Sequence, residues 1–173
     1  MCIRDSAWTL LCQRSTSCSA QTILRQIASF AVRLQSHPVQ GKAHNYSGKL
    51  VKINLTAAAF AQLVYDATFT YTPFRDLPAA LRAFTTGDST PLMRLAAEDA
   101  EYNAAGTPTS NSVGDFEVVS CHDYPTVWQT SASISTRTAE LTTAIAKLKP
   151  NVFSPFTKST YLNSYDELSL IHI

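Results

Sequence analysis

The chain has 173 residues, a formal net charge of +1 and a hydrophobic content of 45%. The balanced charge argues against a nucleic-acid or anionic-membrane surface, because such surfaces carry a basic excess. No apolar stretch is long enough to cross a bilayer, and the hydrophobic content is ordinary for a packed domain. We therefore expect a globular protein with no nucleic-acid partner and no membrane span.

The two ends of the chain are translations of one DNA string read in opposite directions. The bases ATG TGT ATA AGA GAC AG, completed by C or T, encode residues 1–6, and their reverse complement, completed by C, encodes residues 168–173. The string resembles the transposase end sequence that is used as a sequencing adapter. We therefore expect both hexapeptides to be adapter artefacts of a metagenomic assembly, and residues 7–167 to be an internal piece of a longer protein.

The first elements are a helix and a hairpin. Residues 19–36 are predicted to be helical, and Pro38 ends this helix. Its apolar face consists of residues spaced three or four apart, namely Ile23, Ile27, Phe30 and Leu34. Residues 41–56 hold two short extended runs around a turn at Gly48, which predicts a small β-hairpin.

Three further helices are predicted from their start and stop signals. Thr56 is the expected N-cap of the first, and Pro73 lies in the first turn of the second, where a missing N–H costs little. Gly87 ends the second helix, and Pro91 opens the third, which runs to about Tyr102. Their apolar stripes are Phe60, Leu63, Val64 and Ala67, then Leu77, Leu81 and Phe84, then Leu92, Leu95 and Ala96.

The second half of the chain is expected to be less regular. Residues 104–115 are small and polar and predict a flexible loop, and the apolar run that follows, with Phe116, Val118 and Val119, predicts one buried strand. A last helix is predicted from about Thr136 to Leu148, with Leu141, Ile145 and Leu148 on one face. The fold class is therefore mainly α with a small β-hairpin and one isolated strand, whose sheet partners we expect elsewhere in the parent protein.

One constellation of chemically active side chains follows the predicted strand. Cys121, His122 and Asp123 lie together where the strand ends, a position at which a scaffold fixes side chains well. Asp123 could bind a cationic group such as a peptide α-amine; alternatively, it caps a turn and His122 is solvated. A Cys121–His122 nucleophile pair is not expected, because adjacent strand residues point to opposite faces.

Common sequence signatures of catalysis are absent. The sequence has no GxSxG, GxGxxG, P-loop or HExxH motif, so no catalytic residue, metal ligand or cofactor is predicted within it. His37 and His44 are expected at the surface.

The cysteines indicate an oxidising compartment. Cys12 and Cys18 are six residues apart in a polar stretch, whereas Cys121 stands alone. This pattern predicts one local disulfide and one half-disulfide whose second cysteine lies outside this piece. The alternative is three free thiols in a cytosolic protein.

Residues 63–98, with the sequence LVYDATFTYTPFRDLPAALRAFTTGDSTPLMRLAAE, resemble a segment of secreted bacterial α/β-hydrolases of the tripeptidyl aminopeptidase and proline iminopeptidase-like group. VVSCHDYP resembles the apolar strand of that group, which ends in Cys-x-Asp, and CQRSTSC resembles its short cysteine-bounded loop. The resemblance implies that residues 7–167 are the cap, or lid, inserted between the serine nucleophile and the later aspartate and histidine.

Several expectations follow from that resemblance. The parent would be a secreted or extracytoplasmic serine peptidase that releases short N-terminal pieces from peptides, with its triad outside the fragment, which alone would be inactive. The partners of the fragment would be a peptide or ester substrate and the missing hydrolase core, and Cys121 would pair with a later cysteine. The alternatives are the cap of a lipase-like or carboxylesterase enzyme and a non-catalytic secreted helical binding module.

Overall fold

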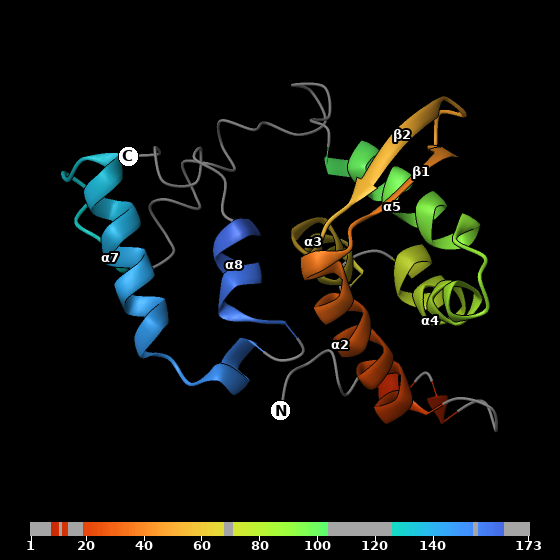
Figure 1. Cartoon of the computed structure of the whole chain (residues 1–173), viewed down its shortest axis with the longest axis horizontal. Coiled ribbons are helices and arrows are strands. Elements are labelled where there is room, and N and C mark those ends of the chain that lie inside the picture. Colours follow the sequence, from red (N-terminus) through yellow and green to blue (C-terminus); the bar gives the residue numbers. More distant parts are fainter. Residues whose placement is uncertain are drawn as a thin grey trace.

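The computed structural model describes residues 8–10, 12–13, 19–67, 71–103, 126–153 and 156–164. Over these residues the chain is mainly α-helical with one two-stranded antiparallel hairpin (Figure 1), which confirms the predicted class. The predicted loop at 104–115 and the isolated strand after it lie outside the described residues. The elements are α2 (Ala20–Ser36), β1 (Val39–His44), β2 (Leu50–Leu55), α3 (Ala57–Asp66), α4 (Tyr71–Thr85), α5 (Thr90–Asn103), α7 (Ile134–Lys147), the 3-10 helix η1 (Pro150–Phe153) and α8 (Lys158–Ser164).

Local signals set most of these boundaries. The Thr56 hydroxyl accepts a hydrogen bond from the Ala59 N–H at 3.1 Å and thereby caps α3, as predicted. Within the described ranges, the two turns with a left-handed backbone both use glycine: Gly48 has a φ of 76° in the hairpin, and Gly87 has a φ of 98° after α4. The predicted helix and hairpin boundaries in residues 19–103 agree with the structure to within about two residues, except that the helix predicted over residues 57–69 ends at Asp66.

The last helices differ from the prediction in three ways. α7 begins at Ile134 rather than Thr136, because Ser133 is its N-cap. Leu148 does not join the apolar face of α7: the helix ends at Lys147, Leu148 adopts an extended conformation, and its side chain is 45% exposed. α8 was not predicted, because it has only seven residues, too few to show a helical period.

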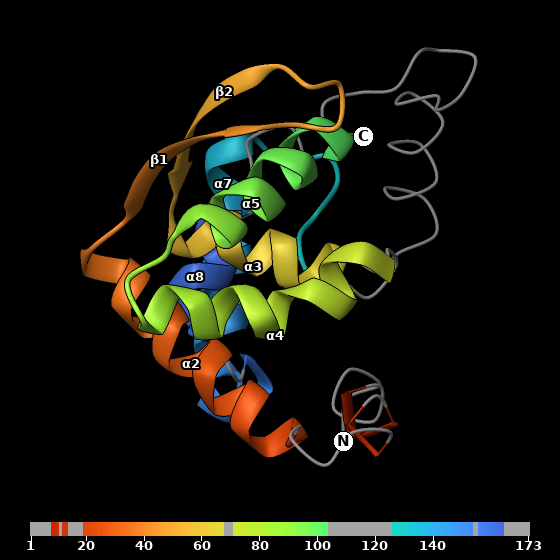
Figure 2. The same ribbon diagram turned by 90° about the vertical axis from the view of Figure 1, so that its right-hand side faces the viewer.

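α5 is the central element of the fold. It packs against α3 and α4 on one side and against the hairpin on the other (Figure 2). The hairpin register pairs Val39 with Leu55, and Gly41 brings the backbone of β1 close to the Met93 side chain of α5. A Cβ at Gly41 would lie 3.0 Å from Met93 Cγ, so glycine permits this close approach. Because α5 is covered on both sides, its residues 95–99 are all buried.

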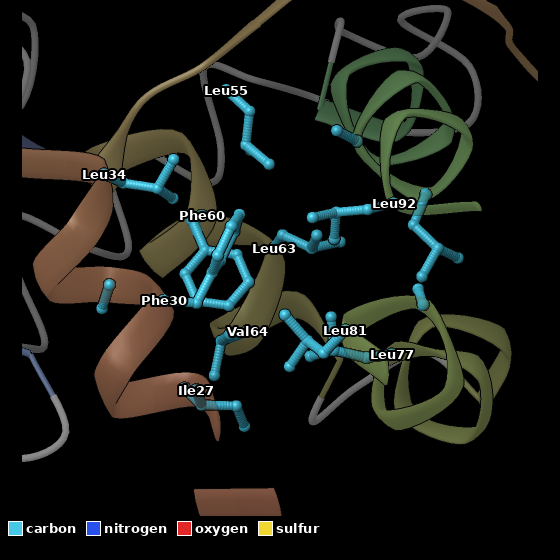
Figure 3. Packing of buried hydrophobic residues seen from close by; sticks show 14 of the residues in the cluster. Ile27, Phe30, Leu34, Leu55, Phe60, Leu63, Val64, Leu77, Leu81 and Leu92 are labelled. Atoms are coloured by element: carbon cyan, nitrogen blue, oxygen red, sulfur yellow. The ribbon is translucent and has the colours of Figure 1, made fainter. Parts of the chain in front are cut away.

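The main hydrophobic core lies between α2, α3, α4 and α5 (Figure 3). Phe30 of α2 is at its centre, with its ring edge-on to Phe60 at 4.9 Å and to Phe84 at 4.8 Å between centroids. The predicted apolar stripes supply the surrounding residues, since Leu63, Leu77 and Leu92 are all fully buried. The core therefore forms from the faces that helical periodicity identifies.

A smaller cluster holds the C-terminal elements together. Leu141 and Ile145 of α7 pack with Phe153 of η1, and Trp128 and Leu162 cover them. α8 lies between α7 and the α2–α3 pair (Figure 1) and packs on α3. The Phe156 ring, which precedes α8, meets Phe60 at 6.1 Å and so joins this segment to the main core.

Candidate functional site

The site residues predicted from the sequence are mostly outside the described part of the chain. Cys18, Cys121, His122 and Asp123 all lie there, so their predicted roles stay predictions. Cys12 is buried, and its pairing with Cys18 stays a prediction. His37 and His44 are exposed, as predicted.

The described residues contain a different cluster of chemically active side chains, centred on two buried carboxyl groups. Asp66 is the last residue of α3, and Asp99 lies in the second half of α5. They are only 6% and 8% exposed, and a side-chain hydrogen bond with Asp66 is among the causes that raise the pKa of Asp99. Gln62, one turn before Asp66, donates its Nε2 proton to Asp66 Oδ2 at 2.9 Å. The packing of α3 on α5 thus brings two carboxyls together inside the protein.

This arrangement changes the acidity of Asp99. Burial, the neighbouring charge of Asp66 and the hydrogen bond with Asp66 raise the pKa of Asp99 to about 7, from an ordinary value of 3.8. Burial disfavours the charged form of a carboxyl, and a second carboxyl beside it disfavours that form further. Asp99 therefore binds or releases a proton near neutral pH.

Glu98 adds a third buried acid to the cluster. It is 3% exposed, and its Oε1 atom accepts a hydrogen bond from Arg94 Nε at 2.8 Å, one turn earlier on α5. Its Oε2 atom is buried with no hydrogen-bond partner among the described residues. The Arg94 side chain is 69% exposed, so it compensates the buried charge only from the solvent side.

The turn of the hairpin lies over the same end of α5. The Ser47 N–H donates to Glu101 Oε2 at 3.1 Å, and this bonding lowers the pKa of Glu101. Partial burial, followed by the charges of Glu98 and Asp99, raises the pKa of the Tyr46 phenol. The acidic end of α5 therefore acts electrostatically on the hairpin above it.

Sequence reasoning missed this cluster, although a signal was present. Asp99 lies three residues after Ala96, four after Leu95 and seven after Leu92, and so continues the apolar stripe of α5. Asp66 lies three residues after Leu63 on α3. An acid on a buried stripe is unusual and indicates a partner or a shifted pKa. Only the packing of the two helices shows that these acids meet each other.

What the cluster can do chemically is limited by its composition. Among the described residues, no group of three or more histidine, cysteine, aspartate or glutamate side chains is arranged to hold a metal ion. The carboxyl pair can exchange a proton, and its burial keeps it away from large substrates. No helix in the described ranges is both long and apolar enough to cross a membrane.

Comparison with known proteins gives no further assignment: no family model, no curated protein and no solved structure matches this chain.

Proposed function

We propose that this chain is the cap region of a secreted serine hydrolase with the α/β-hydrolase fold, and that the parent is an exopeptidase that releases short N-terminal pieces from peptides. The main support is the segment 63–98, whose residues resemble that family. Several residues of segment 63–98 have defined physical roles in the structure. Leu77, Leu81 and Leu92 are core residues, and Gly87 provides the left-handed turn between α4 and α5.

The proposed mechanism assigns the chemistry to the parent rather than to this piece. A Ser-His-Asp triad, with an oxyanion hole of backbone N–H groups, would carry out acyl transfer from outside residues 7–167. The helical layer of α2 to α5 would cover the cleft, exclude water and limit the length of the substrate. The fragment alone is then inactive, since it supplies none of the reacting groups.

Asp123 is the residue we assign to recognition of the substrate amine, and its position after a predicted apolar strand motivates the assignment. A carboxylate and an ammonium group form charge-assisted hydrogen bonds in a partly buried site. His122 beside it would contribute to the same subsite. Both residues act on binding of the free N-terminus and not on the acyl group that reacts.

The test uses the full-length parent and two substrate series, one with a free α-amine and one with that amine blocked. Asp123→Asn is expected to raise KM for free-amine peptides by about tenfold or more, because one charge-assisted hydrogen bond is lost. The KM for N-blocked esters should stay unchanged. Asp76→Asn on α4 is the matched control, because Asp76 is half-exposed and pairs only with its neighbour Arg75 among described contacts. Equal effects on both series would contradict the role of Asp123, and activity restricted to blocked small esters would identify a carboxylesterase instead.

A further inference from the structure

The hairpin forms an outer layer over α5, and the two faces of its sheet differ in character (Figure 2). The side chains that alternate toward the core are buried or half-buried and mostly apolar, as at Ala43, Val51 and Leu55. The side chains that alternate to the other side are exposed and make up the outward face, namely Gln40, Lys42, His44, Leu50, Lys52 and Asn54. This outward face contains two lysines and no acid.

The strand register places the two lysines directly opposite each other, since Lys42 pairs with Lys52. Opposite pairs in an antiparallel ladder alternate between hydrogen-bonded and non-hydrogen-bonded pairs. The Asn45 N–H donates to the Lys49 carbonyl at 3.1 Å, so by this alternation the lysines form a non-hydrogen-bonded pair, in which side chains lie closer. Like charges directly opposite each other destabilise a sheet. The lysine pair therefore does not serve the stability of the hairpin.

The positive charge of the outward face is not compensated within the described ranges. Neither Lys42 nor Lys52 forms an ion pair there, and the same holds for Lys49, which is exposed at the end of the turn. Glu101 of α5 is already bonded to the Ser47 N–H. The outward face is thus a local positive surface on a chain whose formal net charge is only +1.

The backbone of the same residues is open to a further strand. In the described part of the chain the sheet has two strands, so each strand has one edge without a neighbour. The N–H and C=O groups of a residue in a non-hydrogen-bonded pair point away from the partner strand. Leu50, Lys52 and Asn54 therefore direct these groups to the open edge of β2. Such an edge is a template for pairing with another chain, and Leu50, which is 54% exposed, offers it an apolar contact.

We propose that the outward face and the open β2 edge of the hairpin bind an acidic, extended segment of a partner protein. The segment adds to the sheet as a third strand, with main-chain hydrogen bonds to Leu50, Lys52 and Asn54. Its carboxylates pair with the Lys52 ammonium group. Strands lie about 4.8 Å apart, so the long side chain of Lys42 is also within reach of these carboxylates. Charge complementarity selects the acidic partner.

This inference goes beyond the proposed enzymatic function and does not depend on it. The two lysines and the β2 edge belong to the described residues, whereas the proposed catalytic groups lie outside this piece. Failure of the binding test described below would leave the proposed function as it stands.

The test measures binding of labelled peptides to the 173-residue chain by fluorescence anisotropy at neutral pH and low ionic strength. The probe is a peptide of about six residues, a usual strand length, in which glutamate alternates with valine. The comparison peptide has glutamine in place of glutamate. The glutamate peptide is expected to bind at least about fivefold more tightly than the glutamine peptide, and salt should reduce this difference. Equal binding of the two peptides, or no binding of the glutamate peptide, would overturn the proposal.

Two double variants test the role of the lysine pair. Lys42→Gln/Lys52→Gln is expected to weaken binding of the glutamate peptide by about fivefold or more, because two exposed ion pairs are lost. Lys147→Gln/Lys149→Gln is the matched control, since it removes the same charge from exposed positions around the end of α7, and it should bind as the unmodified chain does. Equal weakening in both double variants would show a non-specific charge effect and overturn the proposal.

The stability of the first double variant checks the interpretation of the lysine pair. Because the substitutions remove a repulsion, the urea midpoint of Lys42→Gln/Lys52→Gln should equal or exceed that of the unmodified chain. A lower midpoint would show that the lysines stabilise the hairpin and would contradict their role in binding. The single variant Lys52→Gln provides the same two measurements should the double variant fail to fold.

Amide hydrogen exchange tests the mode of binding. With the glutamate peptide at about ten times its Kd, exchange in β2 is expected to slow by about tenfold, whereas α7 should be unchanged. Binding without any added protection of β2 would overturn strand addition. Binding of duplex DNA or of phosphatidylserine vesicles, without binding of the glutamate peptide, would identify a nucleic-acid or membrane surface and would also overturn the proposal.

Discussion

Replacement of Asp99 by asparagine is expected to change how the free energy of unfolding depends on pH. The folded pKa of Asp99 is about 7, against an ordinary value of 3.8. Between these two values the folded chain holds a proton that the unfolded chain has released. Its stability therefore falls as pH rises. This contribution is fully present below about pH 4 and is lost as pH rises through 7.

The size of the effect follows from the shift. A difference of about three pKa units, at about 1.4 kcal/mol per unit, sets a ceiling of about 4 kcal/mol. Local relaxation and entry of water reduce the cost of a buried charge, so we expect about 2 kcal/mol in practice. Three other acids work in the opposite direction at lower pH. The pKa values of Asp76, Asp88 and Glu101 are lowered, so their contributions to stability are lost only under acid conditions.

The assay is urea denaturation at several pH values between about 5 and about 8.5, with the fluorescence of the two tryptophans as the signal. Trp8 is a suitable reporter because it is buried and stacked on Phe74 at 5.4 Å. The unmodified chain should lose stability over this range, whereas Asp99→Asn should be nearly constant and the more stable of the two above pH 7. Parallel curves for the two proteins would refute the reasoning.

Three other substitutions, the first with Val32→Ala as its control, test the packing described above. Phe60→Ala should lower the free energy of unfolding by about 3–5 kcal/mol in urea denaturation, because it opens a cavity beside Phe30. Its control is Val32→Ala, at a 58% exposed position, which should change that free energy by less than about 0.5 kcal/mol. Gly87→Ala should cost about 1–2 kcal/mol in the same measurement, since alanine is strained at a φ of 98°; an unchanged midpoint would contradict this turn geometry. Arg137→Met should leave the backbone carbonyl groups of residues 130 and 132 without their guanidinium donor, at about 1–3 kcal/mol each, and should increase hydrogen exchange before α7 but not in α5.

Helical periodicity and capping were enough to predict the fold of residues 19–103. The stripe that contains Leu77 and Leu81 is buried as expected, and Thr56 and Gly87 mark ends of helices because each has a local physical role. These features depend on neighbours in the sequence. They can therefore be read without knowledge of the tertiary structure.

The features that the sequence did not reveal depend on contacts between distant residues. α8 is short and is held in place by packing on α3, with the Phe156 ring against Phe60. The proximity of Asp66 to Asp99 requires the approach of two helices. An acid on a buried stripe indicates a partner or a shifted pKa, but it does not say which residue the partner is. In each case tertiary packing, and not local propensity, determines the structure.

The central claim, that this chain is the cap of a larger serine hydrolase, is tested most directly by DNA sequencing across both ends of the coding region. We expect an open reading frame that continues in both directions, with a GxSxG motif upstream of residue 7 and an aspartate and a histidine of the triad downstream of residue 167. It also predicts a cysteine shortly after residue 167 to pair with Cys121. A continuous gene without a GxSxG motif upstream would contradict the account and would favour a helical binding module.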